Sequence, residues 1–332
     1  MKKKSLKVIT LLVTSVLLAA SFTACGAKKK QEAAASGKEL VTIRLANLAV
    51  GLSSAYHQLG VEKGIFKKYG IDLQVVNFPK GGAEATAGVA SGQVDMGSYG
   101  TPILTGISKG LPIKIVASPA VKGNPFILVG TNDIKSVADL KGKTVATGAL
   151  GGGNHQSFLK ILEANGLKEG DVKVVATGGT DAFMILKSGK VAAVMTGEPT
   201  VSQIEADNSG HVLAKAEDVY GKYQHSFIFA TDDFIKKHPE SVSNFLKASR
   251  ESYEYSKNNF DELVAKGKTL TGLDEKVIRE YYKNDIAEWD LSFKVDLEGT
   301  ENAVKILKGL KEIDNNAVFD KDKWTNLSFL DK

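Results

Sequence analysis

Cysteine, metal-ligand spacings and catalytic motifs are scarce or missing in this sequence. Cys25 is the only cysteine among 332 residues, so no disulfide within the chain can stabilise the fold. No H-E-x-x-H or similar spacing occurs among the five histidines, which are His57, His155, His211, His225 and His238. There is no G-x-S-x-G motif and no visible pairing of a nucleophile with a base. We therefore expect no metal, no cofactor and no catalytic residues.

A large charge of one sign is missing as well. The whole chain has 43 Lys and Arg against 38 Asp and Glu, which gives a formal net charge of +5. Residues 1–24 hold four lysines and no acidic residue, so the remainder has 39 basic against 38 acidic residues. A nearly neutral chain gives no electrostatic reason to expect nucleic acid as a partner.

The N-terminal apolar run, residues 8–20, is shorter than the ~20 residues of a comfortable membrane span. It follows four lysines and precedes Ala24 and Cys25, which is the order of a secretory signal peptide over residues 1–24. Cys25 after a small residue resembles a lipobox, although Phe22 stands where an aliphatic residue is usual. The resemblance implies cleavage before Cys25 and lipidation of its thiol. The alternatives are an incidental cysteine after an ordinary signal peptide, or an uncleaved anchor helix.

Residues 25–39 are small and charged without an apolar period, which indicates a flexible tether. From residue 40 the pattern predicts strands that alternate with helices, and it becomes helical from Pro239 onward. The expected strands are 41–45, 71–78, 93–97, 113–118, 126–129, 143–147, 171–176 and 190–195, and the expected helices between them are 53–63, 83–91, 102–109, 136–140, 154–165, 180–188 and 199–206. This alternation predicts an α/β fold with mainly parallel sheets.

An internal repeat supports two similar α/β units. Residues 81–102 align without gaps on residues 178–199, and both copies end in Gly-x-Pro just after a predicted strand. Convergence of two unrelated segments on the same turn chemistry is the alternative. Proline is well placed in the first turn of a helix, where its missing N–H is not needed. Each copy therefore predicts a helix that starts at the carboxyl edge of its sheet.

Four such helix starts are expected, at residues 47–54, 98–102, 148–155 and 196–199. Ligands of open α/β sheets bind beyond the carboxyl ends of strands, and helix N-termini offer unpaired N–H groups there. No Arg or Lys stands clearly at any of these starts, which leaves the charge of the ligand open. The candidate ligand-binding residues are Asn47, Ser54, Tyr99, Gly100, Thr101, Gly153, Asn154, His155, Gly197 and Glu198. His225, before the apolar strand 227–230, is a weaker candidate.

Several stretches together resemble a known family. These are the lipobox, residues 61–73 (VEKGIFKKYGIDL), the Gly-Gly and Ser-Gly-Gln-Val-Asp-Met stretches within 81–96, residues 136–145 (SVADLKGKTV), and Gly197-Glu198-Pro199. They are similar to the substrate-binding lipoproteins of ABC importers, in the nitrate, sulfonate, taurine and thiamine-precursor group. The resemblance covers about residues 40–250 well. Relatives often carry an aromatic residue before Glu-Pro, where this chain has Gly197.

The resemblance implies a two-lobe fold of the type II periplasmic-binding-protein kind, with mixed, mainly parallel sheets. Lobe 1 would comprise residues 40–128 plus 231–332, and lobe 2 residues 129–230. Two crossover strands, 126–130 and 227–231, would connect the lobes as hinges. A small molecule would bind between the lobes, which would close around it.

The implied function is that of an extracytoplasmic, lipid-anchored and monomeric binding protein. Its ligand would be a small organic anion such as taurine or another aliphatic sulfonate, or nitrate, and its partners the permease and ATPase of an importer. An aminopyrimidine, a related thiamine precursor or another aromatic is the alternative ligand. A sensor lipoprotein without a transport role, or an enzyme on the same fold, is the alternative of another class.

Overall fold

The computed structural model describes residues 39–47, 51–78, 82–120, 125–148, 150–151, 153–177 and 181–330. The predicted signal peptide, Cys25 and nearly all of the predicted tether lie outside the described residues. So do Gly81, Gly178 and Gly179 of the repeat. In the part of the chain that is described, no helix is both long and apolar enough to cross a membrane.

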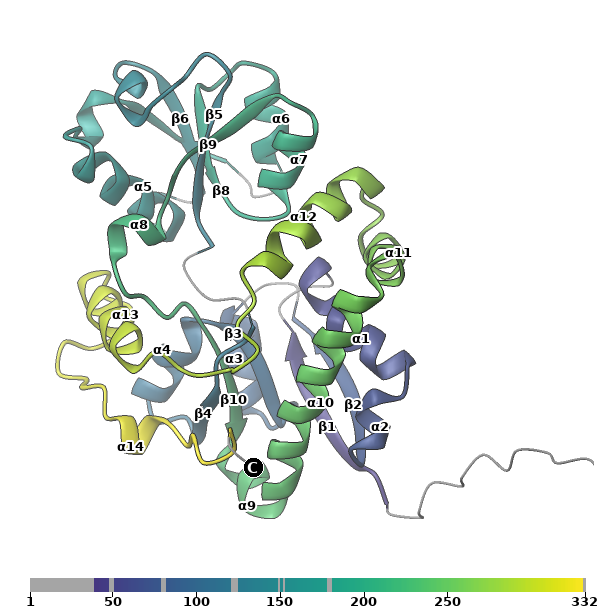
Figure 1. Cartoon of the computed structure of the whole chain (residues 1–332). Helices are drawn as coiled ribbons and strands as arrows, with labels where there is room; N and C mark the ends of the chain where they lie inside the picture. The colour runs from purple at the N-terminus through teal and green to yellow at the C-terminus, as the bar shows by residue number, and fades with distance from the viewer. Residues whose placement is uncertain are drawn as a thin grey trace, which may run out of the picture. The chain divides into compact units, whose positions relative to one another are not determined.

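Two five-stranded sheets organise the described part of the chain (Figure 1). The first has the order β2-β1-β3-β10-β4, and the second has the order β7-β6-β8-β5-β9. Strands β10 and β5 run antiparallel to their neighbours, whereas β1 pairs in parallel with β2 and β3, and β6 with β7 and β8. The predicted α/β fold with mixed, mainly parallel sheets is confirmed.

The strands of the first sheet are β1 (Val41–Asn47), β2 (Ile71–Asn77), β3 (Met96–Gly100), β4 (Ile113–Ala117) and β10 (Ser226–Thr231). Those of the second are β5 (Ile127–Thr131), β6 (Thr144–Thr147), β7 (Lys173–Ala176), β8 (Ala193–Thr196) and β9 (Gly210–Lys215). The two sheets have the same order when β2, β1, β3, β10 and β4 are matched to β7, β6, β8, β5 and β9. The repeat therefore marks equivalent positions, because β3 and β8 begin 97 residues apart.

Helices follow most strands and continue to the C-terminal region. They are α1 (Ala55–Glu62), α2 (Ile65–Lys68), α3 (Gly82–Ala90), α4 (Pro102–Ser108), α5 (Gly153–Ala164), α6 (Ala182–Lys187), α7 (Thr200–Ala206), α8 (Glu217–Tyr220), α9 (Asp232–Lys237), α10 (Pro239–Asn258), α11 (Phe260–Thr271), α12 (Glu275–Ala287), α13 (Leu297–Gly309) and α14 (Lys321–Trp324). Three short 3-10 helices are η1 (Leu52–Ser54), η2 (Val137–Leu140) and η3 (Glu169–Asp171).

Each sheet buries both faces, as the alternation of its strand residues requires. In β10, Phe227 and Phe229 pack into a core with residues of α3, α4 and α13. Ile228 and Ala230 point to the other face, into a core with α1, α10, α11 and α12. In the second sheet, Leu128 and Val129 of β5 likewise enter two different cores.

Side-chain caps fix where the C-terminal helices begin. The Thr231 hydroxyl accepts a hydrogen bond from the N–H of Phe234 at the start of α9, at 3.2 Å. Asp274 accepts from the N–H of Lys276 at 2.8 Å and thereby starts α12. Such caps satisfy N–H groups that have no partner within the helix. The Asp274 cap matters for function because α12 contributes to the cavity described below.

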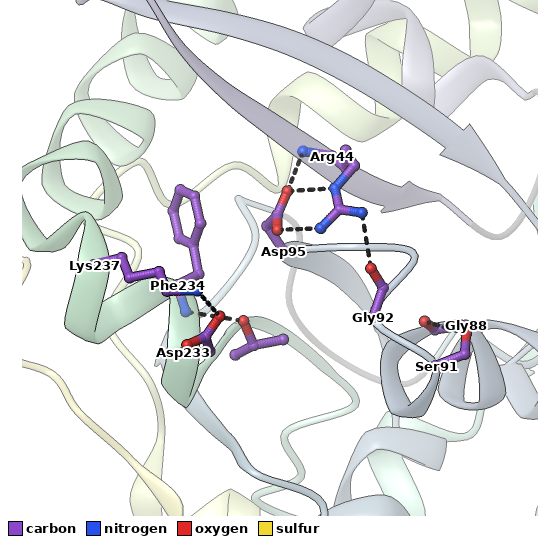
Figure 2. A network of polar contacts seen from close by, with 9 residues as sticks. Arg44, Gly88, Ser91, Gly92, Asp95, Asp233, Phe234 and Lys237 are labelled. Atoms are coloured by element: carbon purple, nitrogen blue, oxygen red, sulfur yellow. Dashed lines mark hydrogen bonds and ion pairs between the residues drawn. The ribbon is translucent and has the colours of Figure 1, made fainter.

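An ion pair fastens β1 to the turn before β3 (Figure 2). The Arg44 guanidinium donates to both carboxylate oxygens of Asp95, at 2.9 and 2.6 Å, and to the Gly92 carbonyl at 2.8 Å. The Arg44 N–H also donates to Asp95 at 2.9 Å, and the Asp95 N–H donates back to the Arg44 carbonyl. Asp95 therefore belongs to the connection that leads into the strand, so β3 begins only at Met96.

Two sequence predictions need correction. The strand expected at 93–97 is β3 at Met96–Gly100, because its ladder with β10 extends to the pair Gly100 and Ser226. Tyr99 and Gly100 are consequently strand residues and not part of a helix-start loop. The sequence also missed β9 and α8, which follow α7. Strand β9 lies at the edge of its sheet with β5 as its one neighbour, and its short apolar stretch gives little periodic signal.

Candidate functional site

A cavity of about 1230 Å³ is lined by residues of both sheets and of the C-terminal helices. Its wall includes the carboxyl ends of β1 and β3 in the first sheet and the residues after β8 in the second. It also includes residues of both connections between the sheets, such as Phe126 and His225. Small-molecule sites commonly measure about 300–1,000 Å³, so this cavity is large enough for any solute of that class.

Six of the ten predicted ligand-binding residues line this cavity, and four do not. The six are Asn47, Ser54, Tyr99, Asn154, Gly197 and Glu198. The four outside the lining are Gly100, Thr101, Gly153 and His155. No ligand marks which residues make contact, so ligand contact stays a prediction for all ten.

Two of the glycines outside the lining make room for side chains that belong to it. A Cβ atom on Gly100 would lie 2.8 Å from the His225 ring, and one on Gly153 would lie 3.0 Å from the Phe126 ring. Real Cβ atoms do not approach so closely without a shift of the neighbour. These glycines therefore let His225 and Phe126 sit where they form part of the wall, which is an indirect role in the site.

His155 is buried and takes part in local structure. Its Nδ1 accepts a hydrogen bond from the Gly151 N–H at 2.9 Å, so the ring proton of the neutral form is on Nε2. That Nε2 lies 3.3 Å from a Glu169 carboxylate oxygen. Only 6% of the residue is exposed. The histidine thus ties the loop before α5 to the helix and to the segment near η3.

The amide and hydroxyl groups of the lining are held by neighbours. Asn154 donates from Nδ2 to the Met195 carbonyl at 3.2 Å, which links α5 to β8. The Ser54 hydroxyl donates to the Gly51 carbonyl at 2.8 Å. The Tyr99 ring packs on Phe229, and its hydroxyl lies 3.3 Å from that of Thr86. Burial raises the pKa of Tyr99 to about 12, so the phenol stays protonated at neutral pH.

Glu198 caps the helix that follows it. Its Oε2 accepts from the Ser202 N–H at 3.1 Å and from the Ser202 hydroxyl at 2.8 Å, in the first turn of α7. The peptide bond between Glu198 and Pro199 is cis. Desolvation raises the pKa of Glu198, the Ser202 hydrogen bonds oppose this, and the negative charges of Glu205 and Asp285 add to it.

Sequence reasoning missed the contribution of α12, where Tyr281 and Asp285 line the cavity. Tyr56 of α1 donates its hydroxyl proton to Asp285, and Trp289 donates from Nε1 to the same oxygen at 3.3 Å. The Tyr56 ring stacks on Tyr253 at 4.9 Å between centroids. A sequence signal existed, because residues 281 and 285 are four apart and share one face of α12, and Trp289 follows four residues later, just beyond the helix.

Burial raises the pKa of Asp285 to about 6, although the hydrogen bonds from Tyr56 and Trp289 act in the opposite direction. Burial also lowers the pKa of His57 and of His225 to about 4 each, and both rings line the cavity. At neutral pH these histidines are therefore uncharged, whereas Asp285 is mostly ionised. The His225 Nδ1 lies 2.9 Å from the Ser226 hydroxyl.

Comparison with known proteins gives a consistent picture. The family model described as NMT1/THI5 like matches residues 55–263. A protein of Bacillus subtilis assigned as an aliphatic sulfonates-binding protein is 27% identical over 287 residues, which cover 84% of this chain and 82% of that protein. The taurine-binding periplasmic protein of Escherichia coli is 29% identical over 203 residues, which cover 58% of this chain and 62% of that protein.

Solved structures show the same fold. The crystal structure of the periplasmic aliphatic sulphonate binding protein SsuA from Escherichia coli matches with a TM-score of 0.70 and 20% sequence identity. The match covers 83% of this chain and 94% of that protein. The fold is therefore that of the periplasmic binding proteins, as expected.

Proposed function

Because the chain belongs to the NMT1/THI5-like family, we propose that it is the extracytoplasmic solute-binding component of an ABC importer. One observation carries the proposal: a single cavity is lined by both sheets in a fold shared with periplasmic solute-binding proteins. Such a cavity can hold a solute between two units that move relative to each other. A permease and an ATPase in the membrane would be its partners.

Binding and release follow from this arrangement. Lobe 1 would comprise residues 40–128 plus 231–332 and lobe 2 residues 129–230, with β5 and β10 as the crossover strands. A solute stabilises the closed form only through contacts that it makes better there than in the open form. Asn47 and Ser54 on one side, and Asn154, Gly197 and Glu198 on the other, supply polar groups for such contacts. The proposed role is binding without catalysis.

The relatives favour a small organic solute of the sulfonate class, such as taurine or another aliphatic sulfonate. Nitrate is a further candidate solute. The wall also supports the alternative of an aromatic solute, such as an aminopyrimidine, because Tyr56, Tyr99, Tyr253 and Tyr281 contribute to it. Aromatic rings offer flat apolar surface to a planar ligand.

The proposal also includes a lipid anchor for the protein. The lysines before residue 8, the apolar run and Cys25 support cleavage of residues 1–24 and attachment of a monomer to the membrane through a lipid on Cys25. Residues 25–39 would then separate the binding fold from the membrane. The protein would act outside the cytoplasm, either on the outer face of the cytoplasmic membrane or in the periplasm.

Substitutions at Asn154 and Asn165 distinguish the cavity lining from the rest of the protein. Asn154→Ala removes a polar group of the lining and is expected to weaken solute binding about 10-fold, the effect of one lost hydrogen bond. Asn165→Ala is the matched control, because Asn165 also donates from Nδ2 to one backbone carbonyl but lies outside the lining, so affinity should stay within about twofold. Calorimetric titration measures both. Equal affinities in the two variants would place the solute elsewhere.

Uptake by cells tests the transport role against a sensor role. Deleting the gene should abolish uptake of the solute that the purified protein binds, and expression of the intact gene should restore it. Expression of a Cys25→Ala variant should restore it poorly, because the protein would lose its anchor. Unchanged uptake in the deletion strain, together with solute binding by the purified protein, would support a sensor and contradict transport.

A further inference from the structure

The charged residues of the cavity are mostly acidic. Within the described part of the chain, five carboxylates line it, namely Glu198, Glu205, Glu217, Asp285 and Glu288. Lys215 is the one cationic side chain of that lining, and its Nζ lies 3.5 Å from Glu217. The charged groups of this wall thus sum to a clear negative excess. Such a wall repels an anion and attracts a cation.

Three of these carboxylates have no cationic partner among the described residues. Glu198 accepts hydrogen bonds from Ser202, and Asp285 accepts from Tyr56 and Trp289, all of which are uncharged donors. Glu205 feels the negative charge of Glu280 on α12. Desolvation raises the pKa of all three carboxylates.

Glu198 and Asp285 line the cavity from different elements. Glu198 precedes α7 of the second sheet, whereas Asp285 belongs to α12, and the negative charge of Asp285 contributes to the raised pKa of Glu198. The Lys276 ammonium of α12 is engaged with the Ala206 carbonyl at the end of α7, at 2.6 Å. Two like charges that face one cavity without a counter-ion are stabilised when a positively charged group enters between them.

The start of α7 is also unsuited to an anion. The sequence predicted that N–H groups at this helix start would be available to a ligand with an anionic or polar head. In the structure the Ser202 N–H already donates to the Glu198 carboxylate. A sulfonate placed there would have to displace that carboxylate and would be repelled by its charge.

The part of the cavity that contains Asp285 suits an organic cation. Tyr56, Tyr253 and Tyr281 line the cavity together with Asp285, and the apolar residues Val201 and Leu273 line it as well. Aromatic faces attract organic ammonium groups, and apolar contact favours a carbon skeleton. A protonated amine would combine charge-assisted hydrogen bonds to the carboxylates with contact to the rings.

We propose that the solute of this protein carries a protonated amine or another organic cation, which Glu198 and Asp285 bind in the cavity beside the Tyr281 ring. This inference rests on the proposed solute-binding function and narrows its ligand. An aminosulfonate fits through its ammonium end, whereas a plain alkanesulfonate, nitrate or bicarbonate lacks the group that the wall selects.

Matched pairs of probes test the charge requirement directly. Taurine and isethionate share an ethanesulfonate frame and differ in an ammonium against a hydroxyl group. Choline and 3,3-dimethyl-1-butanol share a shape and differ in the positive charge. The full-length protein, purified in mild detergent, is titrated calorimetrically with all four compounds and with nitrate. The cationic member of at least one pair is expected to bind about 10-fold or more tightly than its partner, as one charge-assisted hydrogen bond requires.

Two conservative variants connect that preference to the carboxylates. Glu198→Gln and Asp285→Asn keep an oxygen that accepts the present hydrogen bonds but remove the charge. Each should weaken the probe that carries the positive group about 10- to 100-fold and should not weaken the partner that lacks this group. Glu163→Gln, at an exposed carboxylate that is paired with Lys160 and lies outside the lining, is the control and should change nothing.

The following results would contradict the proposal. Equal or tighter binding of isethionate, nitrate or dimethylbutanol would refute the cationic ligand but leave solute binding intact. A cationic probe that binds equally well to both carboxylate variants would move its site away from Glu198 and Asp285. Failure of both cationic probes to bind at millimolar concentration would also count against it, and failure of all five compounds would weaken the proposed function itself.

Discussion

Asp285→Asn is expected to raise the free energy of unfolding by about 2 kcal/mol at pH 7 and to leave it nearly unchanged below pH 4. The pKa of Asp285 is about 6 in the folded protein against an ordinary value of 3.8, chiefly because of burial. Between these values the folded state holds a proton that the unfolded state has lost. The wild-type protein therefore loses stability as the pH rises from about 4 to about 6, and the loss persists above pH 6.

The asparagine removes this penalty, because its amide oxygen can still accept from Tyr56 and Trp289 without a charge to desolvate. Urea denaturation of both proteins at several pH values between 3 and 8 measures the difference. Asp233→Asn, at an exposed carboxylate paired with Lys237, is the matched control and should change stability by less than about 0.5 kcal/mol. A variant that is less stable than the wild type at pH 7 would show that the Asp285 charge supports the fold. If Asp285→Asn is more stable than the wild type, the Asp285 charge lowers the stability of the fold, as expected for a residue that the proposal assigns to solute binding.

Gly60→Ala is expected to lower the free energy of unfolding by about 2–3 kcal/mol. Gly60 lies in α1, where a Cβ atom would come 2.1 Å from the Ser252 hydroxyl oxygen and 2.8 Å from the Ser252 Cβ of α10. The Phe66 ring would be 3.0 Å away. The Ser252 hydroxyl cannot simply turn aside at no cost, since it donates to the Tyr56 carbonyl at 2.6 Å. The two helices would have to separate, and with them the helix that carries Tyr56 to the cavity.

Gly309→Ala is the same substitution at a position where the added methyl group has room. Gly309 is the last residue of α13, and a Cβ atom there would have nothing within 4 Å. Alanine is favoured over glycine in helices by up to about 1 kcal/mol, so this variant should be neutral or slightly more stable. Denaturation curves of the two variants give the comparison. Similar effects at both positions would mean that α1 and α10 do not pack as closely as the structure shows.

The fold could be predicted to a large extent because its signals are local. Alternation within segments such as residues 226–231 places Phe227 and Phe229 on one face and Ile228 on the other. The repeat places β3 and β8 at equivalent positions in two sheets of the same order. Strand β9 was missed because an edge strand of few apolar residues depends on a partner, β5, that is more than 70 residues away along the chain. The start of β3 was misplaced because Arg44, distant in sequence, binds Asp95.

The site could be predicted only in part. The ends of strands and the starts of the helices that follow them carry a local signal, and this signal led to Asn47, Tyr99, Asn154 and Glu198, all of which line the cavity. The wall formed by α12 depends on how the C-terminal helices pack, so the sequence could not assign Asp285 a place in it. Nor could it show that the carboxylate of Glu198 occupies the start of α7, which changes the expected charge of the ligand.

A thermal-shift panel on the purified full-length protein tests most directly whether the cavity binds a solute. The panel contains taurine, isethionate, other alkanesulfonates, nitrate, bicarbonate, aminopyrimidines and choline. A solute at 100 times its dissociation constant adds about 2.7 kcal/mol to the stability of the folded state, which is readily seen as a higher melting temperature. We expect a concentration-dependent rise with at least one of these solute classes, and a much smaller rise in a variant that combines Asn154→Ala with Glu198→Gln. No rise with any compound, or an equal rise in that variant, would contradict it.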